Sequence, residues 1–265
     1  MAKRVLIYTN HFFPEQFKIN EIVDWLLEEN HHVRVVTGLP NYPKGKIFKD
    51  YDNLTKNRYK KEDRLIINRL LLIPRGNGSY FMLAINYLSY FISSILFTFF
   101  LALTKKKYDI VFVHHTSPPL IAIHPIIYSI FHKTKIFMWD LDIWPDTLKA
   151  IGILKSRVIY NFAVVVMKKI YSYYDSILIG SKSFQEIIGK RYNGEITFFP
   201  NWAEKPIENN FVRKDLHLEI PDNKFIIMYT GNIGESQNFD KLTHTIKFID
   251  KKIHWVFIGD GRYKD

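Results

Sequence analysis

The chain has 265 residues, enough for one large domain or two smaller ones, and it is 47% hydrophobic and 24% charged. This composition excludes a disordered chain, and the absence of cysteine excludes disulfides, thiolate metal sites and cysteine nucleophiles. The net charge of +11 favours an anionic partner: nucleic acid, an acidic membrane surface or a phosphorylated small molecule.

The amino-terminal segment predicts a β-α-β unit with a right-handed crossover. Val5–Tyr8 is the first strand, Ile19–Glu29 has apolar residues at the spacing of one buried helix face, and a second strand begins at His32. The first apolar run is too short for a signal peptide, so we expect a cytoplasmic protein. The loop after the first strand carries Glu15 but lacks the glycine pattern of a dinucleotide site, so we do not expect NAD binding.

A glycine- and proline-rich loop at 38–46 follows the second strand. It carries Lys44 and Lys46, and ligands of parallel sheets bind at the carboxyl ends of the strands. The loop is therefore either a binding loop or an ordinary solvated one. Residues 53–64 are rich in lysine and arginine, and Leu65–Ile73 is expected to be the next strand.

The segment Tyr80–Leu103 contains no charged residue and is long enough to cross a hydrocarbon core. Asn86, Ser89, Ser93 and Ser94 nevertheless form a narrow polar stripe at helical spacing. A spanning helix would place strands of one sheet on opposite sides of a bilayer. We favour a helix that lies on the sheet with its outer face at an anionic membrane surface, over a simply buried helix or a spanning one.

The rest of the chain continues the alternation of strands and helices. Strands are expected at 108–113, 135–139 and 176–180 and from 196, and helices at 124–132, 158–174 and 182–190. Residues 204–222 are polar and are interpreted as a linker. A second series then has strands at 225–229 and 255–258 around a helix at 238–249. Because two parallel strands cannot close a core, we expect 223–265 to be an incomplete domain and the chain to be a fragment.

Polar side chains at strand ends are candidate catalytic residues. Asp140 and Asp142 follow one strand, and His115 ends another near the same edge. Such a carboxylate can accept a hydrogen bond or a proton from a substrate hydroxyl. The alternative is structural, with Asp142 or Asp146 capping the next helix and the histidine satisfied within the fold. Trp144 is either a stacking platform or a core residue.

A glycine turn follows the strand that begins at Phe225. Gly231 and Gly234 end the strand just before the expected helix at 238–249. Strand, glycine turn and helix together aim free backbone N–H groups at a phosphate, and glycine lets the backbone approach closely. A tight turn without a ligand is the alternative.

Several motifs follow one another along nearly the whole chain. They are Phe-Phe-Pro-Glu at 12–15, Thr-Gly-Leu-Pro-Asn-Tyr-Pro-Lys-Gly-Lys at 37–46, Asp-Ile-Trp-Pro-Asp at 142–146, Phe-Pro-Asn-Trp at 199–202, Tyr-Thr-Gly-Asn-Ile-Gly at 229–234 and Ile-Gly-Asp-Gly at 258–261. In this order they resemble the family-4 glycosyltransferases with two Rossmann-like domains, the GT-B fold. The chain looks most like bacterial enzymes of O-antigen, capsule and colanic acid synthesis, including the N-acetylfucosamine (L-fucosamine) transferases.

The resemblance implies retaining transfer of a sugar from a nucleotide diphosphate donor, with a UDP-sugar expected, to a polyprenyl-phosphate-linked acceptor at the inner face of the cell membrane. Residues 1–203 would bind the acceptor, through Glu15, Lys44, Lys46 and Trp144. The donor phosphates would lie at Gly231, Asn232, Gly234, Gln237, Gly259 and Gly261. The resemblance implies no metal and no cofactor. The family's paired donor-binding glutamates lie beyond Gly261, so we expect this chain alone to be inactive.

Three other functions are alternatives. One is a non-catalytic remnant that binds lipid-phosphate or a partner synthase, and another is a nucleotide-sugar epimerase with the same fold. The charge-free helix at 80–103 argues against a soluble epimerase. Nucleic-acid binding is disfavoured because the basic residues are scattered and no recognition motif is present.

Overall fold

The computed structural model describes residues 1–51, 58–61 (backbone only), 63–104, 107–203, 220–221, 223–234 and 237–261. The chain divides into two compact units, Met1–Trp202 and Ala203–Asp265, each with its own sheet. The sequence analysis expected a first domain at 1–203 and a second one at 223–265. The expected linker at 204–222 lies almost wholly outside the described residues.

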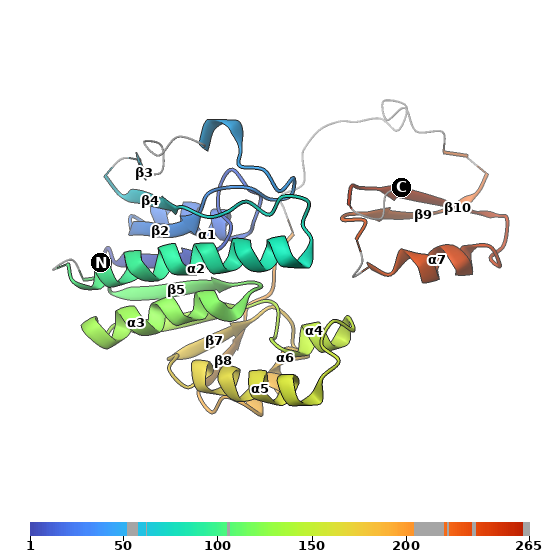
Figure 1. Cartoon of the computed structure of the whole chain (residues 1–265). Helices are drawn as coiled ribbons and strands as arrows, with labels where there is room; N and C mark the ends of the chain where they lie inside the picture. The colour runs from blue at the N-terminus through green and yellow to red at the C-terminus, as the bar shows by residue number, and fades with distance from the viewer. Residues whose placement is uncertain are drawn as a thin grey trace. The chain divides into compact units, whose positions relative to one another are not determined.

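Unit 1 is built on an eight-stranded sheet with the order β3-β4-β2-β1-β5-β6-β7-β8 (Figure 1). All neighbours are parallel except β3, which pairs antiparallel with β4. The central strand is buried from Val5 to Tyr8, as expected for a parallel sheet covered on both faces. The strands are β1 (Arg4–Thr9), β2 (His32–Gly38), β3 (Arg58–Lys61), β4 (Leu65–Leu70), β5 (Ile110–His115), β6 (Lys135–Asp140), β7 (Ser176–Ile179) and β8 (Glu195–Phe198).

Helices cover the two faces of this sheet unequally. One hydrophobic cluster contains Ile19 and Val23 of α1, and a second, larger cluster contains residues of α2, α3, α5 and α6. Helices α2 and α3 lie side by side in Figure 1. The helices are α1 (Ile19–Glu28), α2 (Tyr80–Ala102), α3 (Ile123–His132), α4 (Asp146–Ala150), α5 (Arg157–Tyr171) and α6 (Phe184–Gly189), with 3-10 turns η1 (Lys49–Tyr51) and η3 (Pro119–Ala122).

Helix α2 turns a polar stripe toward the sheet and an apolar surface outward. The Tyr90 hydroxyl donates to the carbonyl of Thr9 at 3.2 Å, and Ser94 Oγ lies 2.7 Å from Nε2 of His124 in α3. The side chains exposed on α2 include Phe81, Leu88, Ile92, Leu96, Phe99 and Phe100. Among the described helices, α2 has the length and composition needed to cross a membrane.

Unit 2 contains two parallel strands, β9 (Phe225–Thr230) and β10 (Ile253–Ile258), joined through α7 (Phe239–Ile246). Phe239 of the helix packs edge-on against Tyr229 of β9 at 5.1 Å and Phe257 of β10 at 5.6 Å between ring centres. This aromatic contact holds α7 against the two strands.

Candidate functional site

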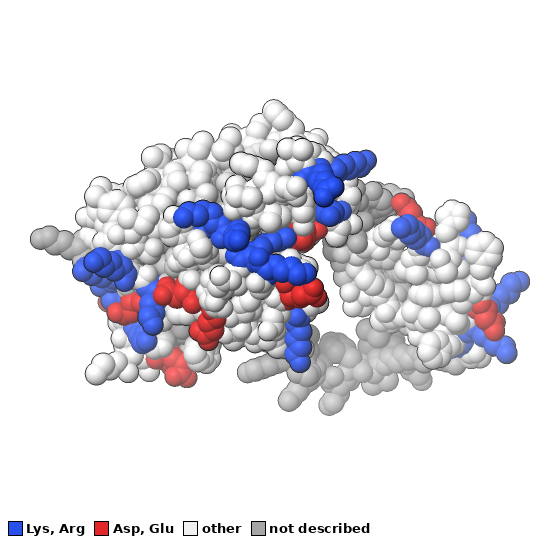
Figure 2. All heavy atoms as spheres, turned by 90° about the horizontal axis from the view of Figure 1, so that it is seen from below, with Lys and Arg blue, Asp and Glu red and all other residues white. Residues whose placement is uncertain are grey.

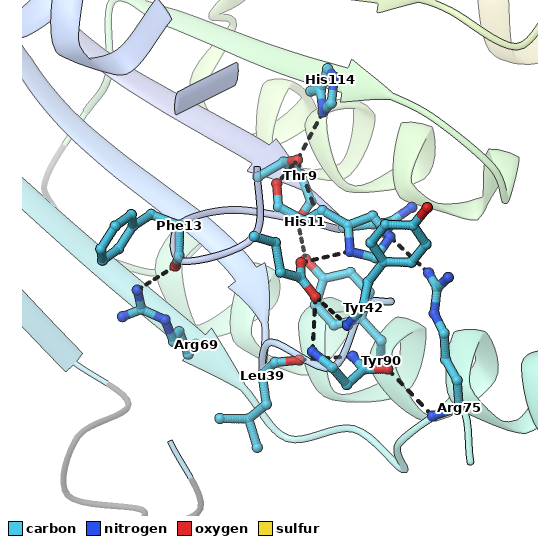
Figure 3. A network of polar contacts seen from close by, with 12 residues as sticks. Thr9, His11, Phe13, Leu39, Tyr42, Arg69, Arg75, Tyr90 and His114 are labelled. Carbon is cyan, nitrogen blue, oxygen red and sulfur yellow. Dashed lines mark hydrogen bonds and ion pairs between the residues drawn. The ribbon is translucent and has the colours of Figure 1, made fainter. Parts of the chain in front are cut away.

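The first polar network of unit 1 joins three loops at the carboxyl ends of β1, β2 and β4 (Figure 3). Arg75 Nη2 lies 2.7 Å from His11 Nε2, and His11 Nδ1 lies 2.7 Å from Oε2 of Glu15. Because a guanidinium can only donate hydrogen bonds, Nε2 of His11 accepts a hydrogen bond from Arg75, and the N–H at Nδ1 donates one to Glu15. Burial lowers the pKa of His11 and the charge of Arg75 lowers it further, against the attraction of Glu15. The imidazole of His11 is therefore neutral, and it connects Arg75 to Glu15 through hydrogen bonds.

Glu15 holds the loop that follows β2. Its Oε1 accepts the backbone N–H groups of Asn41 and Tyr42 at 2.8 and 2.7 Å, and the residue is only 3% exposed. The structure thus places this predicted acceptor residue in a supporting position. That it contacts the acceptor stays a prediction.

Lys44 and Lys46 are exposed on the same loop, next to the loop that carries Arg75. Gly45, with φ of 69°, is where the two loops touch: Gly76 N donates to its carbonyl at 2.9 Å. A Cβ on Gly45 would lie 1.9 Å from the carbonyl oxygen of Gly76, so the contact requires glycine. This packing brings three cationic residues to one sheet edge.

Arg75 is the functional candidate that the sequence analysis missed. Its guanidinium lies 5.3 Å from the ring centre of Tyr42 and 5.4 Å from that of Tyr87, and it donates to His11. Stacked guanidinium groups of this kind are suited to phosphate recognition. The available signal was a single arginine after Pro74, at the end of an apolar strand, which is a weak pattern.

The second network lies at the ends of β5 and β6. His115 Nδ1 lies 3.0 Å from Asp140 Oδ1, and the Tyr171 hydroxyl donates to Oδ2 of the same carboxylate. The backbone N–H groups of Asp142 and Ile143 also point at Oδ1. Burial alone would raise the pKa of Asp140, but the attraction of His115 and these hydrogen bonds lower it.

Both members of this pair, predicted as catalytic residues, are fully buried. Asp140 is surrounded by donors from its own fold and closes the turn after β6. Nε2 of His115 has no hydrogen-bond partner among the described residues, so it is the one polar atom of the pair that is open to a further partner. Their contact with a substrate stays a prediction.

Asp142 and Trp144 tie the β6 loop to the β5 loop. Asp142 Oδ2 accepts from the backbone and the hydroxyl of Ser117, both at 2.6 Å, and Trp144 Nε1 donates to the same hydroxyl at 2.9 Å. The helix-capping alternative is wrong: α4 has no side-chain cap, and Asp146 instead pairs with Arg191 at 2.6 Å. Asp140, Asp142 and Trp144 therefore lie in one region, where their hydrogen bonds hold the loops that follow β5 and β6.

The glycine residues of unit 2 form two loops that pack backbone to backbone. Gly231 N donates to the carbonyl of Ile258 at 2.9 Å, and Ile233 N to that of Asp260 at 2.8 Å. A Cβ on Gly259 would lie 1.8 Å from the carbonyl oxygen of Gly231, and one on Gly261 would lie 2.1 Å from that of Ile233.

Gln237 closes the first of these loops. Its side-chain oxygen accepts the N–H of Gly234 at 3.1 Å and an amide proton of Asn232 at 3.3 Å. Gly231 and Asn232 are exposed at the end of β9, ahead of α7. The predicted phosphate-binding residues are thus brought together. Their binding of a donor stays a prediction.

Comparison with known proteins agrees with this architecture, although no protein-family model matches the chain. The chain is 24% identical over 278 residues to the Escherichia coli K12 protein named "Putative colanic acid biosynthesis glycosyl transferase WcaI". The alignment covers 97% of this chain and 66% of that relative.

Three solved structures show the same fold. Sucrose-phosphate synthase from Thermosynechococcus elongatus has a TM-score of 0.61 at 13% identity, covering 97% of this chain and 62% of that one. Starch synthase IV from Arabidopsis thaliana, solved with ADP and acarbose, has 0.55 at 13%, covering 98% and 69%. Trehalose-phosphate synthase from Burkholderia vietnamiensis has 0.55 at 12%, covering 100% and 64%. These are GT-B glycosyltransferases, so the predicted α/β GT-B fold class is confirmed, and the curated relative agrees with the resemblance to enzymes of colanic acid synthesis. Membership of family 4 and the N-acetylfucosamine type stay predictions.

Proposed function

We propose that this protein is a glycosyltransferase of cell-surface polysaccharide synthesis. The observation that carries the proposal is similarity over 97% of the chain to a relative named for colanic acid biosynthesis, together with a GT-B fold. The chain spans 66% of that relative's length, so the activity proposed is that of the whole protein.

The donor in this proposal is a nucleotide diphosphate sugar, with UDP as the expected nucleotide. The two glycine loops of unit 2 support it, because Gly231 and Asn232 stand exposed between the end of β9 and α7. Backbone N–H groups in such a turn, together with a helix N-terminus, stabilise the charge of a departing diphosphate. The proposal includes neither a metal nor another cofactor.

The acceptor is a lipid-linked phosphate, and the sugar is transferred with retention of configuration. Lys44 and Lys46 are exposed beside Arg75, and three cationic side chains at one sheet edge suit a phosphate or diphosphate. Glu15 and His11 hold these loops in place. His115, through its unpartnered Nε2, is the candidate for a hydrogen bond to the transferred sugar.

The test is sugar transfer by the full-length product of the gene. A panel of UDP-sugars is offered with polyprenyl-diphosphate-linked acceptors, and the product anomer is assigned by NMR. The expected result is donor-dependent transfer with retention that survives EDTA, because backbone amides and cations neutralise the leaving group. Absence of transfer with every donor would favour the non-catalytic remnant, and loss of activity in EDTA would contradict the metal-free chemistry.

The same proposal places the enzyme at the inner face of the membrane, bound through the outer surface of α2. Leu96 and Phe100 are each 65% exposed there, and Ile130 and Phe131 of the adjacent α3 are 67% and 50% exposed. Figure 2, which views the molecule from below, shows a wide area of unit 1 without charged side chains, with both basic and acidic side chains beside it. An apolar surface with basic side chains beside it is a composition that binds an anionic interface.

Cosedimentation with anionic vesicles measures this binding. Leu96→Glu puts a charge in the centre of the surface and should weaken binding by about tenfold or more. The matched control is Trp25→Glu, because Trp25 is 56% exposed on α1, on the opposite face of the sheet. Equal binding by both variants and the unaltered chain would contradict the assignment of this surface.

A further inference from the structure

A basic pocket lies at the amino-terminal edge of the unit 1 sheet. Its volume is about 220 Å³, and its polar lining is Arg4, His32, Arg34, Asp63, Arg64 and Tyr108. Most of these residues stand at or just before the starts of β1, β2, β4 and β5, and Arg34 is the third residue of β2. The candidate site lies at the opposite ends of the same strands, and a six-residue strand such as β1 separates the two by ~17–20 Å. The pocket is therefore separate from that site.

Two guanidinium groups in the pocket share one aromatic ring. The guanidinium carbon of Arg4 lies 5.2 Å, and that of Arg34 5.9 Å, from the ring centre of Tyr108, which is 6% exposed. Like charges brought together in this way repel, and the aromatic face offsets only part of that repulsion. Asp63 also lines the pocket, but no ion pair joins it to Arg4 or Arg34 within the described part of the chain.

Neither Arg4 nor Arg34 forms an ion pair within the described part of the chain, and Nε of Arg34 is buried without a hydrogen-bond partner. The nearby carboxylate of Asp109 is used elsewhere, since its Oδ2 accepts the backbone N–H of Arg4 at 2.7 Å. Buried guanidinium N–H groups are normally bonded, so an orphaned one points to a missing acceptor.

Arg64, the third arginine of the pocket, is held in position by hydrogen bonds. Nη1 of Arg64 donates to the carbonyl of Leu27 and to the side-chain oxygen of Asn30, both at 2.9 Å. These bonds hold the guanidinium where its charge adds to that of Arg4 and Arg34. A ligand would therefore meet a basic pocket that needs little further ordering.

We propose that this pocket binds a phosphate group, with Arg34 as its principal donor and Arg4 beside it. A phosphate presents the oxygens that a planar guanidinium fork matches, and it supplies the charge that the two arginines lack. The pocket is smaller than the ~300–1,000 Å³ typical of sites for whole drug-sized ligands, so it suits a phosphate head rather than a complete nucleotide. The phosphate belongs either to a soluble phosphate or to a lipid phosphomonoester headgroup.

Titration of the chain with inorganic phosphate at low ionic strength, followed by calorimetry, tests the proposal. We expect saturable binding that weakens as salt is added, because the interaction is between charges near the surface. Arg34→Gln and Arg4→Gln should each weaken it by about tenfold or more, since each removes a charge-assisted contact. Arg157→Gln, which removes an exposed arginine on α5, is the matched control and should leave the affinity unchanged.

Arg34→Lys distinguishes a loss of phosphate binding from a folding defect. It keeps the positive charge but removes the planar guanidinium. We expect this variant to unfold at the same temperature as the unaltered chain without phosphate, and to gain less stabilisation when phosphate is added. The proposal is overturned if the unaltered chain shows no saturable phosphate binding. It is also overturned if Arg34→Gln and Arg4→Gln bind phosphate as tightly as the control.

Vesicles distinguish the two sources of the phosphate. Phosphatidylcholine vesicles containing phosphatidic acid are compared with vesicles of equal charge containing phosphatidylglycerol, whose phosphate is a diester. A preference for phosphatidic acid that disappears in Arg34→Gln assigns the pocket to a lipid headgroup. Equal binding to both vesicles, with Arg34-dependent binding of inorganic phosphate, assigns it to a soluble phosphate.

Discussion

The strand ends of unit 1 and unit 2 are built in different ways. In unit 1, ionisable side chains close the loops by bonding to one another, as His11 does with Glu15 and His115 with Asp140. In unit 2, the loops meet through their backbones, as Gly231 does with Ile258. The difference shows that a side chain chosen for its chemical type can act first as a support, whereas close backbone contact between two loops restricts the residues themselves to glycine. Substitutions should therefore affect the two regions differently.

The largest expected effect is that of Asp140→Ala on the stability of unit 1. The substitution leaves His115 and Tyr171 buried without their partner, which should cost about 3–5 kcal/mol of unfolding free energy. Urea denaturation measures this loss. Asp142→Asn is the control, because Asp142 is only half-buried and is bonded to Ser117; its loss should be about 1 kcal/mol. An Asp140→Ala chain of full stability would show that the pair is not a support.

Acid should unfold unit 1 through its buried histidines. Burial lowers the pKa of His114 to about 3 and that of His124 to about 4, from an ordinary value of 6.5. Between these values the unfolded chain binds more protons than the folded one, so stability is fully present above about pH 6.5 and falls as pH falls. Each histidine contributes about 1.4 kcal/mol per pH unit, or about 3 kcal/mol for both at pH 5.5.

Denaturation curves between pH 7 and pH 5 measure this slope. His124→Gln keeps a group that can donate to the Ile121 carbonyl and accept from Ser94, but removes the titration. The slope should then fall by about 1.4 kcal/mol per pH unit, the share of one histidine. An unchanged slope would mean that His124 does not contribute to the acid sensitivity.

A smaller effect is expected from Gly259→Ala, and it should be confined to unit 2. The added Cβ would overlap the carbonyl of Gly231, so the loops must separate, at a cost of about 1–3 kcal/mol. Gly189→Ala is the matched control, because nothing lies within 4 Å of its Cβ at the end of α6, and it should stabilise by up to about 1 kcal/mol. Hydrogen exchange resolves the two units. Destabilisation of unit 1 by Gly259→Ala would contradict the prediction.

The sequence predicted most of the fold because buried strands and one-sided helices have clear apolar patterns. β1, α2 and β6 were found within two residues of their expected bounds. β3 was missed because its residues, 58–61, are Arg-Tyr-Lys-Lys, and an edge strand can be polar. α4 was missed because five residues are too few to show a helical period.

The candidate site was less predictable, since its contacts join loops that are distant in sequence. The sequence placed Asp140 and His115 at one sheet edge, but the closure of their pair by Tyr171, 31 residues beyond Asp140, depends on how α5 packs. Arg75 carried no motif, and only the fold brings it within 2.7 Å of His11, 64 residues earlier. The glycine loops were predictable because close backbone contact restricts the residue type itself.

Hydrogen–deuterium exchange of the chain with and without UDP is the decisive measurement for donor binding by unit 2, because it reports on backbone amides. We expect saturating UDP to slow exchange at 231–234 and 259–261 and to leave 11–15 and 140–146 unchanged. Slowed exchange only at the strand-end loops of unit 1, or none at all, would contradict this expectation.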